Sequence, residues 1–207
     1  MWSGRDTRRL MNEGGRRVDV IRQLTEATRT GSVTLGVCPV LDDGMGAHAA
    51  SVIARAAAAR TSDQRILLIE TTRKTSVLSG EFGVARSAAG LQEMLLPPPL
   101  NRFDTIHRTT IPNLFLLPSG GFRKAKVACN LDQVEWIHRM LIAHFPGIVM
   151  ELPAMGELLG RPSTFTHHLP DSVVLVAGFG SVGYRAVRRA TSRLKTADAN
   201  LAGSLLM

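Results

Sequence analysis

Apolar residues in this chain gather mostly in short continuous runs instead of alternating with polar residues. The runs cover residues 33–37, 66–69, 114–117, 148–150, 173–177 and 201–207. A strand covered on one face alternates apolar and polar residues, whereas a strand covered on both faces is apolar throughout. The pattern therefore predicts a mainly parallel sheet that is covered by helices on both faces.

Stretches with the apolar spacing or composition of helices lie between these runs, at residues 47–60, 87–95, 131–144 and 181–195. Before the first run, Val18, Ile21 and Leu24 recur at three-residue spacing and predict an amphipathic helix over residues 16–29. The three prolines at 97–99 place a loop after the second of the internal helices. Alternating strands and helices are typical of a doubly wound α/β fold.

The length of the chain fits one domain. At 207 residues there is little room for a second core, so we expect a flexible basic arm over residues 1–15 and a single α/β domain over residues 16–207. No apolar run reaches the roughly 18 residues that cross a bilayer, and no signal peptide is evident. We therefore expect a cytoplasmic protein in which Cys38 is a buried free thiol and Cys129 forms no structural disulfide.

The net charge of +8 comes from 25 basic residues against 17 acidic ones. Such a balance permits contact with nucleic acid or with anionic lipid headgroups and does not select between them. Because no basic strip interleaved with aromatic residues accompanies the charge, binding to nucleic acid is the less favoured interpretation.

The first apolar run leads into a glycine-bearing loop, Asp42-Asp43-Gly44-Met45-Gly46-Ala47-His48, and then into a helix. This is the form of a phosphate-binding loop, in which backbone N–H groups hold phosphate, a lysine holds the β- and γ-phosphates, and a Ser or Thr hydroxyl holds magnesium. No Lys or Arg occurs between Arg29 and Arg55, so no alignment restores the cation. The two aspartates would repel a triphosphate while favouring the positive end of the helix.

Other patterns of polar residues carry less information. Glu70 and Glu151 each follow an apolar run, and without a metal they are strand-end polar residues. Residues 178–183 have the glycine spacing of a dinucleotide fingerprint, but no later strand ends in an acid, so a tight turn is expected there. His48 is read as a polar residue at a helix start, and His167-His168 lack a third ligand at metal spacing. We therefore assign no metal site.

Four segments resemble the bacterial tyrosine autokinases of capsule and exopolysaccharide synthesis, within the MinD/ParA-type P-loop ATPases. They are the loop above, residues 65–76, the Pro-Asn-Leu and Leu-Pro-x-Gly pattern of residues 110–120, and the strand and following proline of residues 145–154. Residues 171–177 and 200–203 are similar to the closing strands of that family. The resemblance spans roughly residues 16–207 and implies a P-loop NTPase-like fold.

The departures from this family fall on its catalytic positions. The family has aspartates where this chain has Glu70 and Glu151, which are the catalytic candidates if the protein is active. The loop remnant, Asp43 to His48, lacks the lysine and the hydroxyl, and the tyrosine-rich tail is absent. Losing these groups removes most of what stabilises charge in phosphoryl transfer. ATP and magnesium are therefore doubtful cofactors.

The resemblance implies a catalytically degenerate regulator or scaffold of exopolysaccharide synthesis or export. Its partner would be a membrane chain-length (polysaccharide co-polymerase) protein or another export component, with homo-oligomers as a further option and a peripheral place at the inner face of the membrane. Two alternatives stay open: an active ATPase or protein-tyrosine kinase with an atypical loop, and a ParA-like module on nucleic acid.

Overall fold

The computed structural model describes residues 20–72, 77–85, 87–95, 102–121, 131–156 and 170–207. Their centre is a seven-stranded sheet in the order β3-β4-β2-β5-β1-β6-β7. The strands are β1 (Val33–Pro39), β2 (Ile66–Glu70), β3 (His107–Arg108), β4 (Leu114–Leu117), β5 (Gly147–Glu151), β6 (Ser172–Ala177) and β7 (Leu201–Leu206). All neighbours run parallel except β3 and β4. The mainly parallel sheet is therefore confirmed.

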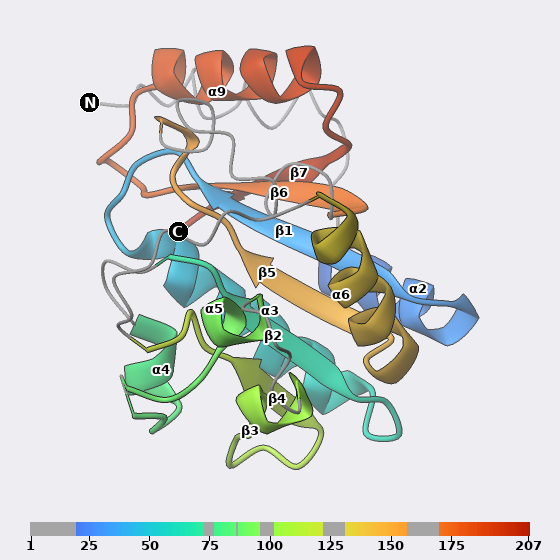
Figure 1. Cartoon of the computed structure of the whole chain (residues 1–207). Helices are drawn as coiled ribbons and strands as arrows, with labels where there is room; N and C mark the ends of the chain where they lie inside the picture. Colours follow the sequence, from blue (N-terminus) through green and yellow to red (C-terminus); the bar gives the residue numbers. More distant parts are fainter. Residues whose placement is uncertain (1–19, 73–76, 86, 96–101, 122–130, 157–169) are drawn as a thin grey trace.

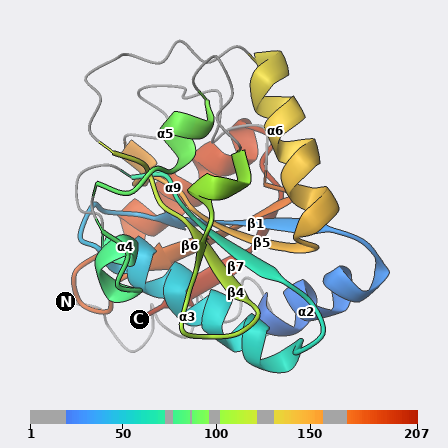
Figure 2. The ribbon, with the colours of Figure 1, turned by 60° about the horizontal axis from the view of Figure 1, so that its bottom comes forward.

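Helices cover both faces of this sheet (Figures 1 and 2). One face carries α2 (Val20–Thr30), α3 (Met45–Arg60) and the short α4 (Val77–Glu81). The opposite face carries α5 (Leu91–Met94), α6 (Leu131–His144) and α9 (Tyr184–Thr196). A parallel sheet needs this double cover because its strands are apolar on both sides. The predicted doubly wound architecture is confirmed.

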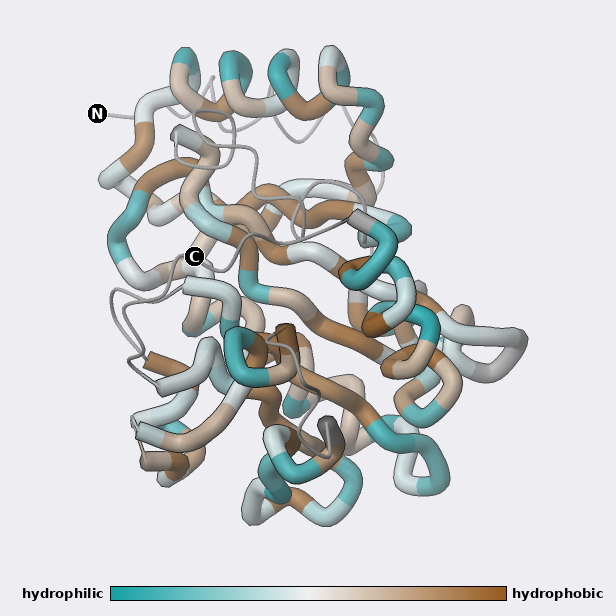
Figure 3. Tube along the Cα trace, in the orientation of Figure 1, coloured by the Kyte–Doolittle hydropathy of each residue, from teal (hydrophilic) through white to brown (hydrophobic). Residues whose placement is uncertain are grey.

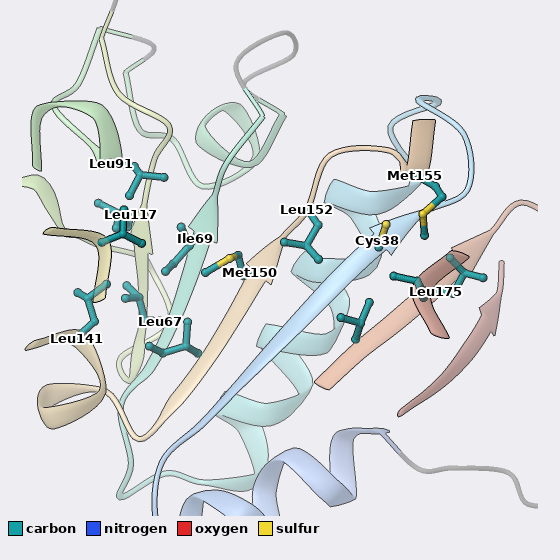
Figure 4. Close-up of a cluster of buried hydrophobic side chains, with 14 of the residues drawn as sticks. Cys38, Leu67, Ile69, Leu91, Leu117, Leu141, Met150, Leu152, Met155 and Leu175 are labelled. Atoms are coloured by element: carbon teal, nitrogen blue, oxygen red, sulfur yellow. The ribbon is translucent and has the colours of Figure 1, made fainter. Parts of the chain in front are cut away.

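Two apolar clusters, one on each face, form the core. The alanine-rich face of α3 packs closely on β1, β2 and β5, and the larger side chains of α6 fill the other face. Cys38 at the end of β1 belongs to this second cluster and lies near Met155 and Leu175 (Figure 4). It is a buried free thiol, as the sequence predicts. Cys129 and the prolines at 97–99 lie outside the described residues.

The Pro-Asn-Leu pattern has a structural explanation in this fold. The Asn113 side-chain amide lies within hydrogen-bond distance of three backbone carbonyls, those of Ala58 (2.9 Å), Thr61 (2.7 Å) and Gln64 (3.1 Å). It thereby joins the loop before β4 to the end of α3 and to the loop before β2. A half-buried amide with these partners fixes the entry of two neighbouring strands.

The predicted helix over residues 87–95 is wrong for most of its length, because only Leu91–Met94 is helical. Gly90 is extended, with φ −155° and ψ −147°, and a side chain there would meet the Pro118 carbonyl and come within 2.6 Å of the Gly120 nitrogen. The loop after β4, which contains Pro118 and Gly120, comes so close to Gly90 that the helix begins only at Leu91. The last long helix begins at Tyr184 instead of Ser181 because the preceding residues form a turn.

The N-terminal amphipathic helix is found over Val20–Thr30, and its predicted start and the basic arm lie outside the described residues. Leu24, Thr25 and Thr28 are buried, and α2 packs against α3. Leu24 of the apolar row is thus used inside the domain. No helix in the described ranges has both the length and the apolar character that crossing a membrane requires.

Candidate functional site

The two glutamates and the glycine-bearing loop meet at the edge of the sheet where the parallel strands end. Glu151 is in register with Glu70 on one side and with Val37 on the other. Paired positions in neighbouring strands present their side chains to the same face, and Val37 belongs to the cluster that packs under α3. Glu70 and Glu151 therefore lie on the α3 face of the sheet.

The loop between β1 and α3 is held by its own residues. Gly44 has φ +80°, a left-handed conformation that glycine adopts readily. An Asp43 carboxylate oxygen (Oδ1) accepts a hydrogen bond of 3.1 Å from the Met45 N–H, the first of the helix. A side chain on Gly46 would come within 2.7 Å of Pro39. Both glycines thus have a structural reason to be there.

Glu70 is buried, and both of its oxygens have partners. Oε1 accepts hydrogen bonds from the N–H groups of Leu78 (3.0 Å) and Ser79 (3.3 Å). Oε2 accepts from the Ser79 hydroxyl (2.6 Å) and the Ser119 N–H (3.3 Å). The carboxyl group therefore joins β2 to the first turn of α4 and to the loop after β4. The Glu70 carboxyl oxygens thus accept their hydrogen bonds from groups of this chain.

Glu151 is also buried, at 5% exposed, but it has fewer partners. Its Oε1 accepts a hydrogen bond of 2.8 Å from the Thr72 hydroxyl, while Oε2 has no hydrogen-bond partner among the described residues. Burial raises the pKa of this carboxyl to about 7; the Thr72 hydrogen bond opposes the rise, and the Glu70 and Asp42 carboxyls add to it. Near neutral pH the group is therefore a partly protonated acid.

These residues do not fit a magnesium–triphosphate complex. No lysine or arginine lies in the chain between residues 29 and 55, and Ala47, where a lysine would stand in the Gly-x-Gly-Lys pattern, is buried in the α3 cluster. The first helical N–H is bonded to Asp43. A phosphate at the start of α3 would meet a carboxylate instead of a cation, and repulsion between like charges opposes its binding.

The turn of residues 178–183 lies beside this loop. Gly180 has φ +79°, Gly183 is the residue just before α9, and a side chain on Gly178 would lie 3.6 Å from a carboxylate oxygen of Asp43. The Ser181 N–H and hydroxyl both donate to the Gly178 carbonyl. This is the tight strand-to-helix turn that the sequence predicts.

The remaining candidate groups offer little chemistry. Burial raises the pKa of the Cys38 thiol to about 12, so it stays protonated and is a poor nucleophile. His48 is exposed in the first turn of α3, and His167-His168 lie outside the described residues. In the ranges that the structure describes, no three His, Cys, Asp or Glu side chains are grouped so that they could hold a metal ion.

Sequence reasoning missed the donors that serve the two glutamates. Thr72 lies two residues after Glu70 in the chain, but its hydroxyl bonds to Glu151 on the next strand. Glu70 is served by the Ser79 hydroxyl and the Ser119 backbone N–H. The Thr71-Thr72 pair at a strand end was a visible signal of polar contacts. The contact with Ser119 spans 49 residues, and no local pattern indicates it.

The fold has relatives among solved structures. The kinase domain of the Escherichia coli tyrosine kinase Etk superposes with a TM-score of 0.71 and 21% identity, covering 88% of this chain and 74% of that one. The VpsO kinase domain gives a TM-score of 0.71 at 17% identity, with 99% and 98% covered. MinD of Pyrococcus horikoshii, complexed with Mg-ADP, gives 0.65 at 14%, with 84% and 70% covered.

These likenesses show a P-loop NTPase-like fold that resembles tyrosine autokinase domains. No protein-family model and no curated protein matches the chain. The expected fold is thus confirmed.

Proposed function

We propose that this chain is a catalytically degenerate relative of the tyrosine autokinases, and that it regulates or scaffolds exopolysaccharide synthesis or export through protein contacts. The fold of the autokinase domains is retained over nearly the whole chain. The groups that would receive a nucleotide are replaced by groups that serve the chain itself.

One observation carries this proposal: the start of α3 is occupied by an anion of the protein. Helix N-termini attract phosphate because their N–H groups are free and the helix dipole is positive there. Here the Asp43 carboxylate accepts the first of these N–H groups. Because no lysine lies nearby in the loop to offset the negative charge of Asp43, we expect the loop to bind phosphate weakly.

The partner follows from the family resemblance and is the cytoplasmic part of a membrane chain-length protein. The contact surface that we propose for it is α2. Leu24 of the apolar row is buried and α2 packs against α3, so Leu24 is not available for such a contact. Docking through α2 would therefore use its polar side, where Arg22 forms an ion pair of 2.7 Å with Glu26.

Calorimetric titration of Mg-ATP and Mg-ADP into the purified chain tests the nucleotide part. We expect no heat of binding at millimolar nucleotide. Binding tighter than about 100 μM, near −5.5 kcal/mol, would overturn the proposal. An Asp43→Ser, Ala47→Lys, His48→Ser variant is the matched gain-of-function protein, and Asp42→Ser in place of Asp43→Ser is its control. Only the variant that frees the Met45 N–H should gain affinity.

The scaffold part needs its own measurement, because failure to bind nucleotide does not identify a partner. Light scattering of the purified chain, alone and with the cytoplasmic segment of a chain-length protein, reports self-association and complex formation. A complex with defined stoichiometry supports the scaffold. If neither occurs, the scaffold proposal fails even if nucleotide binding is absent.

A second candidate function is an ATPase with an atypical loop. It is favoured by Oε2 of Glu151, which has no hydrogen-bond partner among the described residues. That oxygen lies at the end of the strand next to β1, where a general base or metal ligand would be useful. This candidate requires ATP turnover that Glu151→Ala abolishes and that Glu151→Asp retains in part. The absence of turnover in the wild-type chain excludes it.

A further inference from the structure

The outer face of α9 carries a strip of positive charge that forms no ion pair among the described residues. Five exposed basic residues point away from the sheet: Arg185, Arg188, Arg189, Arg193 and Lys195. The opposite face, Val187, Ala190 and Leu194, is buried in the core. In the described part of the chain, none of the five forms an ion pair. Figure 3 shows the hydrophilic positions of α9 on its outer side.

Part of this charge has no explanation in the fold. Arg193 and Lys195 lie in the last turn, where cations are favoured by the negative end of the helix dipole. Arg185 lies in the first turn, which contains no acid, and a cation is unfavourable there. Arg188 and Arg189 share its face at three- and four-residue spacing, so the three charges also repel one another. A strip that opposes local stability points to a partner.

An exposed apolar spot lies at the N-terminal end of the same helix. Phe179, in the turn that leads into α9, is 68% exposed, and Leu206 at the end of β7 is 39% exposed. The Phe179 N–H donates to the Met207 carbonyl at 2.5 Å, so this turn and the end of β7 are neighbours. A basic helix beside an exposed aromatic side chain is the combination that binds membrane surfaces.

We propose that the outer face of α9 binds an anionic lipid surface, with Phe179 entering the headgroup region. Arginines spaced along one outer helix supply headgroup contacts, and the phenyl ring supplies the apolar contact that phosphate chemistry alone does not use. Nucleic acid is the weaker candidate because no aromatic residue is interleaved among the basic residues of the strip for bases to stack on. This inference is independent of the proposed scaffold function.

Co-sedimentation of the full-length chain with phosphatidylcholine vesicles, with and without phosphatidylglycerol, tests the proposal at about 0.15 M salt. We expect binding only to the anionic vesicles. The variant Arg185→Gln, Arg188→Gln, Arg189→Gln should bind at least about tenfold more weakly while its melting temperature stays the same or rises. Phe179→Ser should cause a smaller, several-fold loss.

A matched control removes the same charge elsewhere. Arg22→Gln, Arg60→Gln, Arg139→Gln changes one exposed arginine on each of three other helices and should alter vesicle binding less than about twofold, because those charges lie on other helices. An equal loss in both triple variants would overturn the proposal, as would equal binding to neutral vesicles. Tighter binding to duplex DNA than to anionic vesicles, lost in the α9 variant, would assign the face to nucleic acid instead.

Discussion

Glu70 and Glu151 occupy equivalent places on neighbouring strands, and they differ in what surrounds them. They are paired in register at the ends of β2 and β5, and both are buried. Glu70 accepts four hydrogen bonds from protein groups. The Thr72 hydroxyl donates to one oxygen of the Glu151 carboxyl, and the other, buried oxygen has no hydrogen-bond partner among the described residues. Glu70 thus uses both carboxyl oxygens to join elements of the fold, whereas Glu151 has an oxygen that could still accept a hydrogen bond.

This difference follows from what packs beyond each strand end. The chain after β2 turns back so that α4 begins over Glu70, which places two helical N–H groups and a hydroxyl on its carboxyl group. Among the described residues, the Glu151 carboxyl is served by Thr72, just beyond the end of the neighbouring strand β2. Burial without sufficient donors raises the pKa of an acid. Glu151 is accordingly the group of this site whose charge changes near neutral pH.

The largest effect is expected from Glu70→Ala. The substitution leaves the N–H groups of Leu78, Ser79 and Ser119 and the Ser79 hydroxyl without their acceptor, and each buried donor that loses its partner costs about 1–3 kcal/mol. We expect the free energy of unfolding in urea to fall by about 3–5 kcal/mol. Glu70→Gln keeps one oxygen acceptor and should lose about half as much. A loss below about 1 kcal/mol for Glu70→Ala would remove the contrast between the two acids.

A smaller effect should appear in the pH dependence of stability. Because the pKa of Glu151 is about 7 in the folded chain against 4.5 when unfolded, the folded state binds the extra proton between these values. Its contribution is therefore fully present below about pH 4.5 and is lost as the pH rises to about 7, at up to about 1.4 kcal/mol per pH unit.

Glu151→Gln cannot titrate, so the difference in unfolding free energy between wild type and this variant isolates the group from all others. We expect that difference to change by about 2–3 kcal/mol in favour of the variant between pH 4.5 and 8. A difference that stays constant across this range would show that the carboxyl ionises normally in the fold.

Thr72→Val should have a more modest effect, of about 1 kcal/mol. It removes the side-chain donor that the described residues give to the Glu151 carboxyl, and the pKa of Glu151 should then rise further above its ordinary value. Thr71→Val is the matched control, because the Thr71 hydroxyl donates to the Glu151 backbone carbonyl and not to its carboxyl. A pKa shift of equal size in both variants would contradict the assignment of Thr72.

The smallest effect is expected at the loop. Asp43→Ala removes the acceptor of the Met45 N–H and should lower stability by about 0.5–1 kcal/mol, as for other residues that cap helices. Asp43→Asn keeps an acceptor oxygen and should be close to neutral. If Asp43→Ala instead raises stability, the aspartate is not serving the helix, and the explanation of the loop fails.

Long elements could be predicted from the sequence, while short elements and the surroundings of the two acids could not. Continuous apolar runs identified β1, β2 and β5, and helical spacing identified α6. The two-residue β3 and the five-residue α4 are too short to have a period. The break at Gly90 depends on the backbone of Pro118 and Gly120, which is distant in sequence.

The candidate site was predictable in its residues but not in their roles. Glu70 and Glu151 were found from their places after apolar runs, and the parallel pairing of β2 and β5 brings them together in the structure. What separates them is the set of donors contributed by Ser79, Ser119 and Thr72. Those contacts depend on where the chain returns after each strand, which composition and spacing do not specify.

The most direct test of the central claim, that this edge of the sheet serves the chain and not a nucleotide, is an NMR titration of the Glu151 carboxyl carbon with and without Mg-ATP. We expect the pKa of Glu151 to be near 7, raised by burial, and to be the same at millimolar Mg-ATP. An ordinary pKa near 4.5 would contradict the account. So would a clear fall in the pKa on addition of Mg-ATP, because it would mean that the carboxylate faces bound magnesium.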